Sequence, residues 1–580
     1  MQEDLAVFLH RYTVVSIEGR QSLKTSEQIQ PDVNTAQTLK TRRRFPSLVV
    51  TLFLFELCYL LIVALSPLPE LRLIGSPLAL AWTWTLLPSR LLLALYPSSG
   101  TRVWLSPALL GLALSGLLAA YAYSIRSVSR LSEAKRMQRR WLTILLGGAF
   151  LFSLTLLFQP TLFSDDVFTY IFSGRIFALY HADPFNTAPV QFTPDPYLRW
   201  VIAGRNAPNL YGPLWYYISS LLVSVGGNNQ VLTLLLFKCL AVLSHLLNIA
   251  LVWSILTRIA PQRRIIGTLL YAWNPLILIE LAGSGHSEGV LLLLLFLATR
   301  LYVARESFWS RIGAFMLFGL ALSMNLIVAL FAPLLLWFDV RSERAIPRAI
   351  AGFCWRAAIV LLPAISIWLP FWRGGSTFFA LTSAIDMDHF VHSPLGTLVG
   401  PTHAFFRLIA YVLRFPSYWN PISSADVALR GSTTFIFVLI YGNVFGQVRH
   451  APTLVSGRHT VALTNQDSTL PGFNVLLKAW SIAVFAYLML VAGWFWPWYL
   501  LWLLWVVVLR GIDVFASAML VLSGTVLFFY LSMGFISRPI TLYQSTFIFG
   551  LPLVYLVGVK WRQLQSERTA ILHDGRSETA

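Results

Sequence analysis

The sequence predicts an all-α, polytopic membrane protein with about 12–14 transmembrane helices. Of its 580 residues, 57% are hydrophobic and only 12% are charged, so its apolar side chains exceed what one soluble core can bury. Lys and Arg together number 43 against 25 Asp and Glu, and many of the basic residues lie in short stretches between apolar runs. This pattern is typical of cytoplasmic loops and does not favour nucleic-acid binding.

The first part of the chain is expected to be a polar tail followed by three spans. Residues 1–44 are mostly polar and end in KTRRR, which predicts a disordered cytoplasmic tail. The first span, 45–66, has no small-residue cleavage motif and is therefore an anchor. Basic residues after the second span, 103–123, place that end in the cytoplasm if 76–97 lies in the interface. The third span, 141–159, then exits on the extracytoplasmic side.

Two large external loops are expected within a single transmembrane domain, 45–559. The first loop, 160–231, contains the short apolar stretch 211–227, which either dips into the bilayer or crosses it. The second loop covers 372–430, and 560–580 form a cytoplasmic tail. The remaining spans are predicted near 232–257, 266–282, 289–303, a pair within 312–338, 350–371, 431–447, 476–492, 494–509, 514–532 and 540–559.

Two adjacent acids stand at the head of an amphipathic helix just after the third span, in FSDDVFTYIFSGRIFALYHADPF. We expect this helix to begin at Ser164, which caps it, with Asp165 and Asp166 in its first turn. Such acids complement the helix dipole, and this alone is one explanation for them. The other is that one acid performs chemistry at the membrane surface while its neighbour caps, because successive helical residues point about 100° apart.

Several motifs together resemble a known family. Asp166, Tyr170, the run GRIFALYHADPF and YGPLW at Tyr211–Trp215 are similar to the C-type (GT-C), polyprenol-phosphate-sugar-dependent glycosyltransferases. They are most similar to the bacterial alpha-mannosyltransferases of the cell envelope. The resemblance implies that an acid of the first external loop is the catalytic base. Asp166 takes that role, and Asp165, at a position that varies in the family, is a second candidate catalytic acid.

Two further motifs supply candidate substrate-binding residues. WNPLILIELAGSGHSEG is similar to the family's Asn-Pro followed by Gly-x-x-His-Asn-Asp, which indicates His286 and Glu288, although Ser and Glu here replace Asn and Asp. A buried interfacial histidine is the alternative for His286. WFWPWYLLW resembles Pro-Trp-Tyr-x-x-Trp and indicates Trp498 and Tyr499, for which an interfacial aromatic belt is the alternative.

A phosphate leaving group requires nearby positive charge and hydrogen-bond donors. Arg175 and Arg205 are the external cationic candidates, although either side chain also suits snorkelling to the interface. Lys238 lies inside a span, where a lysine is costly. Its ammonium group is expected to pair with a phosphate, to pair with Glu280 on a neighbouring span, or to snorkel to the interface. The aromatic candidates for substrate contact are Tyr170 and Tyr211.

The resemblance implies transfer of a hexose, taken to be mannose, from a polyprenyl monophosphate to an envelope glycolipid or glycan. Asp166 would deprotonate the acceptor in an inverting displacement at the outer face of the cell membrane, with both termini cytoplasmic. We expect no cofactor and no metal, because no metal-ligand spacing is present in the first loop. Asp386, Asp388 and His392 of the second loop either bind the acceptor or cover the site. The alternative function is a transporter or flippase of lipid-linked sugar.

Overall fold

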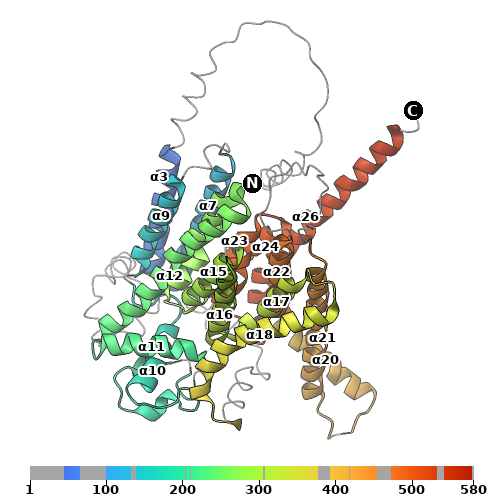
Figure 1. Cartoon of the computed structure of the whole chain (residues 1–580). Helices are drawn as coiled ribbons and strands as arrows, with labels where there is room; N and C mark the ends of the chain where they lie inside the picture. Colours follow the sequence, from blue (N-terminus) through green and yellow to red (C-terminus); the bar gives the residue numbers. More distant parts are fainter. Residues whose placement is uncertain are drawn as a thin grey trace. The chain divides into compact units, whose positions relative to one another are not determined.

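The computed structural model describes residues 45–65, 99–131, 139–157, 159–202, 204–208, 211–304, 307–375, 392–416, 418–452, 472–531 and 541–577. In these ranges the regular elements are helices (Figure 1), and the only strand-like feature is an isolated bridge between His392 and Trp494. The predicted all-α fold is therefore confirmed. The predicted tail 1–44, the interfacial stretch 76–97, and Asp386 and Asp388 lie outside the described residues.

Contacts divide the chain into a short unit, Met1–Val50, and a large unit, Thr51–Ala580, which is described from here on. The first three predicted spans are helices α3 (Phe45–Leu65), α7 (Ser99–Ser129) and α9 (Arg140–Leu157). Phe55 on α3 stacks on Phe152 of α9, with ring centroids 5.0 Å apart, and both rings meet Trp273 edge-on at 5.9 Å. This buried aromatic group joins the N-terminal helices to the central ones.

The predicted loop 160–231 folds into short helices. Helix α10 (Asp166–Ala178) is followed by two single turns, η1 (Pro189–Phe192) and η2 (Leu198–Trp200), and by α11 (Pro213–Gly226). Helices α10 and α11 lie side by side (Figure 1), and a Cβ on Gly174 would lie 2.6 Å from the backbone oxygen of Ser219, so only glycine allows this approach. With 14 residues, α11 is about 21 Å long, which is short for a crossing.

The central span predicted at 266–282 is broken. Helix α12 (Gln230–Ile259) leads through η3 (Pro261–Arg263) to α13 (Arg264–Ala272), and the chain then bends by 47° into α14 (Pro275–Leu278) and the π-helical turn η4 (Ile279–Gly283). The break follows from the sequence, because Asn274 accepts hydrogen bonds from the Leu276 and Ile277 amides and Pro275 occupies the first helical position. Helix α15 (Glu288–Ala304) returns alongside α12.

The C-terminal half agrees with most of the predicted spans. Its helices are α16 (Phe308–Met324), η5 (Leu326–Leu330), α17 (Ala332–Val340), α18 (Ile346–Trp368), η6 (Leu369–Phe371), α20 (Gly396–Val412), α21 (Pro421–Arg449), α22 (Phe473–Leu490), η7 (Pro497–Leu500), α23 (Leu501–Arg510), α24 (Val514–Thr525), η8 (Val526–Phe528) and α26 (Thr541–Ser577). The predicted loop 372–430 contains α20 and the start of α21. Helix α21 begins well before residue 431 because Asn420 caps it and Pro421 suits its first position.

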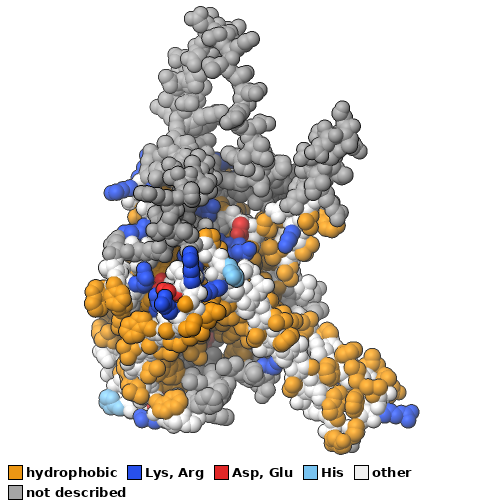
Figure 2. Space-filling view, turned by 45° about the vertical axis from the view of Figure 1, so that its right-hand side comes forward, with side chains coloured by type: hydrophobic (Ala, Val, Ile, Leu, Met, Phe, Trp, Pro, Cys, Tyr) orange, Lys and Arg blue, Asp and Glu red, His pale blue; other side chains and the backbone are white. Residues whose placement is uncertain are grey.

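The helices carry an apolar outer surface suited to a bilayer. Seven of the described helices are long and apolar enough to cross a membrane, or eight if the bent pair around Asn274 is one span, and shorter apolar helices accompany them. Large hydrophobic side chains are exposed along α18 and α21, among them Trp355, Leu362, Phe435 and Val438. Hydrophobic side chains cover much of the face in Figure 2. The protein is thus polytopic, and the count of about 12–14 crossings remains a prediction.

Candidate functional site

The two acids lie at the start of α10, with one correction to the expected cap. The helix begins at Asp166, and Asp165 occupies the N-cap position without a side-chain capping bond. Ser164, expected to be the first residue, precedes the helix, and its hydroxyl still accepts a hydrogen bond from the Asp166 amide at 3.3 Å. Thr161 donates its hydroxyl to the Ser164 carbonyl, which tightens this turn. Asp166 is therefore held by its backbone at the positive end of a helix.

The Asp166 carboxylate is largely buried and faces a histidine. Its side chain is 19% exposed, and its Oδ2 lies 3.9 Å from Nδ1 of His286. Burial raises the pKa of Asp166 from 3.8 to about 6, against the lowering effect of the charge on His286 and with smaller raising effects of Asp165 and Glu280. A carboxylate with this pKa is ionised at neutral pH and is a stronger base than an ordinary one.

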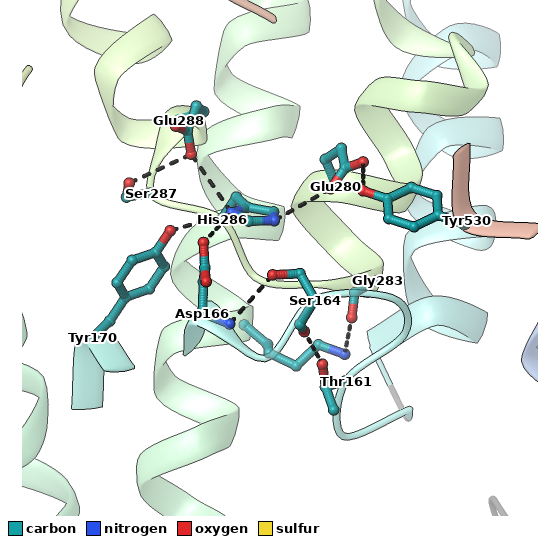
Figure 3. Close-up of polar contacts among 11 residues, drawn as sticks. Thr161, Ser164, Asp166, Tyr170, Glu280, Gly283, His286, Ser287, Glu288 and Tyr530 are labelled. Atoms are coloured by element: carbon teal, nitrogen blue, oxygen red, sulfur yellow. Dashed lines mark hydrogen bonds and ion pairs between the residues drawn. The ribbon is translucent and has the colours of Figure 1, made fainter. Parts of the chain in front are cut away.

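His286 is the centre of the polar cluster in Figure 3. Its Nε2 lies 3.2 Å from Oε2 of Glu280, and its Nδ1 lies 3.2 Å from the Tyr170 hydroxyl and 3.8 Å from Oε2 of Glu288. Burial alone lowers the pKa of His286, but the close carboxylate of Glu280 and the charges of the other surrounding acids outweigh it, so the pKa is raised. A positively charged imidazole is therefore favoured beside Asp166.

The local sequence explains how this histidine reaches the cluster. It follows the π-helical turn η4 through Ser284 and Gly285, and Gly285 has a φ of 76°, a conformation that glycine adopts without strain. The turn carries His286 back towards α10 before α15 begins at Glu288. Gly285, directly before the predicted histidine, is thus required by its backbone geometry.

The predicted aromatic residues form one wall of the site. Tyr170 lies one helical turn after Asp166, so both side chains share a face of α10. Its ring meets Tyr211 edge-on at 4.8 Å and Trp215 at 5.3 Å. The packing of α11 on α10 therefore brings the YGPLW segment next to Asp166 and Tyr170.

The late aromatic motif lies at the same cluster, where Trp498 contacts His286 and Tyr499 interacts electrostatically with Asp166 and Glu288. Trp498 stacks on His286, with ring centroids 4.2 Å apart, and also on Trp496 at 5.1 Å. Tyr499 instead stacks on Trp502 at 4.2 Å. His392 of the second predicted loop meets Trp496 at 5.2 Å. The Trp498 ring therefore packs directly on the His286 imidazole, and the neighbouring rings extend the aromatic surface around it.

Lys238 lies next to the cluster but contacts main-chain oxygens. Its Nζ donates to the carbonyls of Leu156 and Gly283, each at 3.0 Å, and to the carbonyl of Gln159. These three acceptors are backbone carbonyls, so the contacts do not include the predicted alternative of a pair with Glu280. The ammonium joins the end of α9 and the start of the following loop to the end of η4, so it fixes the two segments that carry Asp166 and His286.

The two predicted arginines lie elsewhere in the loop. Arg175 is buried, forms an ion pair with Asp195 at 2.8 Å, and lies over the ring of Tyr197 at 4.3 Å. Arg205 is exposed, and its carbonyl accepts a hydrogen bond from the Val190 amide. The Arg175 guanidinium is thus engaged in holding the loop together, and its predicted contact with a phosphate remains a prediction, as does that of Arg205.

Two residues of the site were not among the predicted ones. The sequence indicates Glu280 as an intramembrane acid and a possible partner of Lys238, and no motif indicates Tyr530. The Tyr530 hydroxyl donates to Oε1 of Glu280 at 2.5 Å, across 250 positions of sequence. Glu280 could have been predicted as a site residue, because it is an acid within an apolar span six residues before His286. No local sequence feature marks Tyr530. Within the described ranges, no group of three or more His, Cys, Asp and Glu side chains is arranged to hold a metal.

The fold and this cluster define a polytopic helical membrane protein with an acid and histidine centre between α10 and a broken span. Residues 73–341 match the family model of alpha-(1->6)-mannopyranosyltransferase, N-terminal domain. All residues of the cluster except Trp498 and Tyr530 lie within that match. The resemblance predicted from the sequence is confirmed over this part of the chain.

A curated relative supports the same similarity. The chain is 25% identical over 189 residues to alpha-(1->6)-mannopyranosyltransferase A of Corynebacterium glutamicum. The aligned part is 32% of this chain and 36% of the relative, so the chain spans about a third of the length of the curated relative that it matches.

Proposed function

We propose that this protein is an integral membrane mannosyltransferase that uses a polyprenyl monophosphate sugar as donor. The observation that supports this most is the Asp166 carboxylate, held at a helix start in an environment that raises its pKa, within 3.9 Å of a histidine whose pKa is also raised. The similarity of residues 73–341 to the mannopyranosyltransferase family supplies the sugar and the reaction class. The acceptor is an envelope glycolipid or glycan.

The reaction follows from the arrangement of these groups. The ionised Asp166 takes the proton of an acceptor hydroxyl, and the hydroxyl oxygen forms a bond to the anomeric carbon. The bond from that carbon to the phosphate oxygen breaks on the opposite face, its electron pair stays on the phosphate, and the anomeric configuration is inverted. A protonated His286 balances the charge that accumulates as the phosphate leaves. No metal is needed for charge balance in this scheme.

The membrane setting agrees with such a donor. Its prenyl tail remains in the bilayer, next to the apolar surfaces of the helices, and its head group meets α10, which follows directly after the span α9. We propose that this end of the helices is extracytoplasmic, because the basic residues between α7 and α9 favour the cytoplasm for the other end.

The proposal is tested with purified protein in vesicles supplied with polyprenyl-phosphate-[¹⁴C]mannose and a mannolipid acceptor. We expect labelled product of inverted anomeric configuration, undiminished by a chelator, and none from a water-soluble sugar nucleotide. Product with retained configuration would contradict the displacement, and activity lost in the chelator and restored by a divalent ion would contradict metal independence. Movement of labelled donor across the bilayer without transfer would favour the flippase alternative.

A further inference from the structure

Glu280 is a buried acid inside the membrane domain. It lies in the π-helical turn η4, its side chain is fully buried, and its carboxylate lies between the Tyr530 hydroxyl at 2.5 Å and His286 Nε2 at 3.2 Å. An ionised carboxylate in such a place is costly unless both oxygens have partners. Here Oε1 accepts the hydrogen bond of Tyr530 and Oε2 lies at ion-pair distance from His286 (Figure 3), so these two side chains together orient the acid.

This contact determines which nitrogen of the imidazole faces Asp166. The 3.2 Å approach of Nε2 to Oε2 is an ion-pair contact that lacks the angles of a hydrogen bond, and it favours a proton on Nε2 opposite the Glu280 carboxylate. Nδ1 is then the nitrogen directed at α10 and α15. The titratable groups that face the ring are Asp166 and Tyr170 on α10, Glu280 in η4 and Glu288 at the start of α15. Those that interact with Asp166 from further elements are Asp165, Tyr211, Tyr499 and Tyr530.

We propose that Glu280 and Tyr530 are positioning residues of the transferase: the tyrosine orients the acid, and the acid fixes His286 with its protonated Nε2 inward and its Nδ1 beside Asp166. This inference rests on the proposed function and extends it, because neither residue touches Asp166 in the described contacts. It also gives the π-helical turn a purpose, since the turn places an acid of a membrane span against a histidine six residues later.

Loss of Glu280 is expected to raise the pKa of Asp166. Without this acid a positive charge on His286 is disfavoured. Among the charges acting on Asp166, the lowering effect of His286 is larger than the raising effect of Glu280. Removing both therefore raises the pKa of Asp166, and the acid limb of the rate profile moves to higher pH.

The test compares kcat and KM for sugar transfer against pH in the native protein, Glu280→Gln and Tyr530→Phe. For Glu280→Gln we expect kcat to fall about tenfold or more and the KM for the donor to stay nearly constant. The midpoint of the acid limb of the rate profile should move up by about one pH unit. Tyr530→Phe is expected to act in the same direction but less. The matched control is Tyr302→Phe, which removes a similar tyrosine-to-carboxylate bond, to Asp339 at 2.9 Å, away from the site and is expected to change neither quantity.

Two outcomes would overturn the inference. One is an unchanged kcat and acid limb in both variants while the native protein transfers sugar. The other comes from ¹⁵N histidine spectra of the native protein, with His286 assigned by its absence in His286→Gln. We expect a protonated Nε2 whose signal shifts in Tyr530→Phe, and an unprotonated Nε2 would refute the inference. Because the spectra need no turnover, they decide it even if the native protein transfers no mannose, a result that would instead reject the proposed function.

Discussion

Replacement of Asp166 by Asn is expected to stabilise the protein while it removes the proposed base. Burial raises the pKa of Asp166 from 3.8 to about 6, a shift of about two units. At 1.36 kcal/mol per unit, the ionised side chain costs the folded state up to about 3 kcal/mol, and its 19% exposure makes this an upper bound. The folded state binds this proton more tightly than the unfolded state, so stability falls as pH rises from about 4 to about 6.

The asparagine does not ionise and therefore avoids this loss. We expect Asp166→Asn to unfold at a higher temperature than the native protein at pH 7.5, with the difference shrinking towards pH 4, where the native carboxyl is protonated. Thermal unfolding in detergent at several pH values measures this directly. The control, Asp165→Asn, removes an adjacent charge that raises the pKa of Asp166, so a smaller gain is expected. Equal unfolding temperatures of Asp166→Asn and the native protein at pH 7.5 would show that ionised Asp166 does not destabilise the fold.

Three further predictions follow from the same contacts. Initial transfer rates should increase as pH rises through about 6, where Asp166 loses its proton, and a flat rate profile from about pH 5 to 8 would be inconsistent with this base. Arg175→Met should lower the free energy of unfolding by about 3–5 kcal/mol, because it leaves the buried Asp195 charge unpaired, and an unchanged thermal transition would reject this. Lys238→Met should lower kcat with little change in donor KM, since its three acceptors are carbonyls; a raised KM with constant kcat would instead indicate a phosphate ligand.

The sequence was sufficient for the all-α fold and for part of the site. Apolar runs located most helices, and helical spacing placed Asp166 and Tyr170 on one face. The resemblance to a family indicated His286, which the structure places 3.9 Å from Asp166. These positions were predictable because each depends on residues that are close together in the chain or on a motif with a fixed order, and the catalytic and binding roles assigned to them stay predictions.

Contacts between residues far apart in the chain could not be predicted from the sequence. The partner of Glu280 is Tyr530, 250 positions away, and Lys238 binds backbone oxygens, which carry no residue-specific signal. Asp195 was not recognised as the partner of Arg175 because the two are joined by the folding of an irregular loop. The expected helix start at Ser164 was wrong because Asp165, equally able to occupy an N-cap, takes that position instead.

The central claim is that Asp166 is the base of a sugar transfer from a lipid-linked monophosphate. Its most direct test is transfer of labelled mannose from polyprenyl-phosphate-mannose by membranes that contain equal amounts of the native protein, Asp166→Asn or Asp165→Asn. We expect transfer by the native protein, a loss of about a hundredfold or more in Asp166→Asn, and retention of most activity in Asp165→Asn. Equal transfer by the native protein and Asp166→Asn would contradict it.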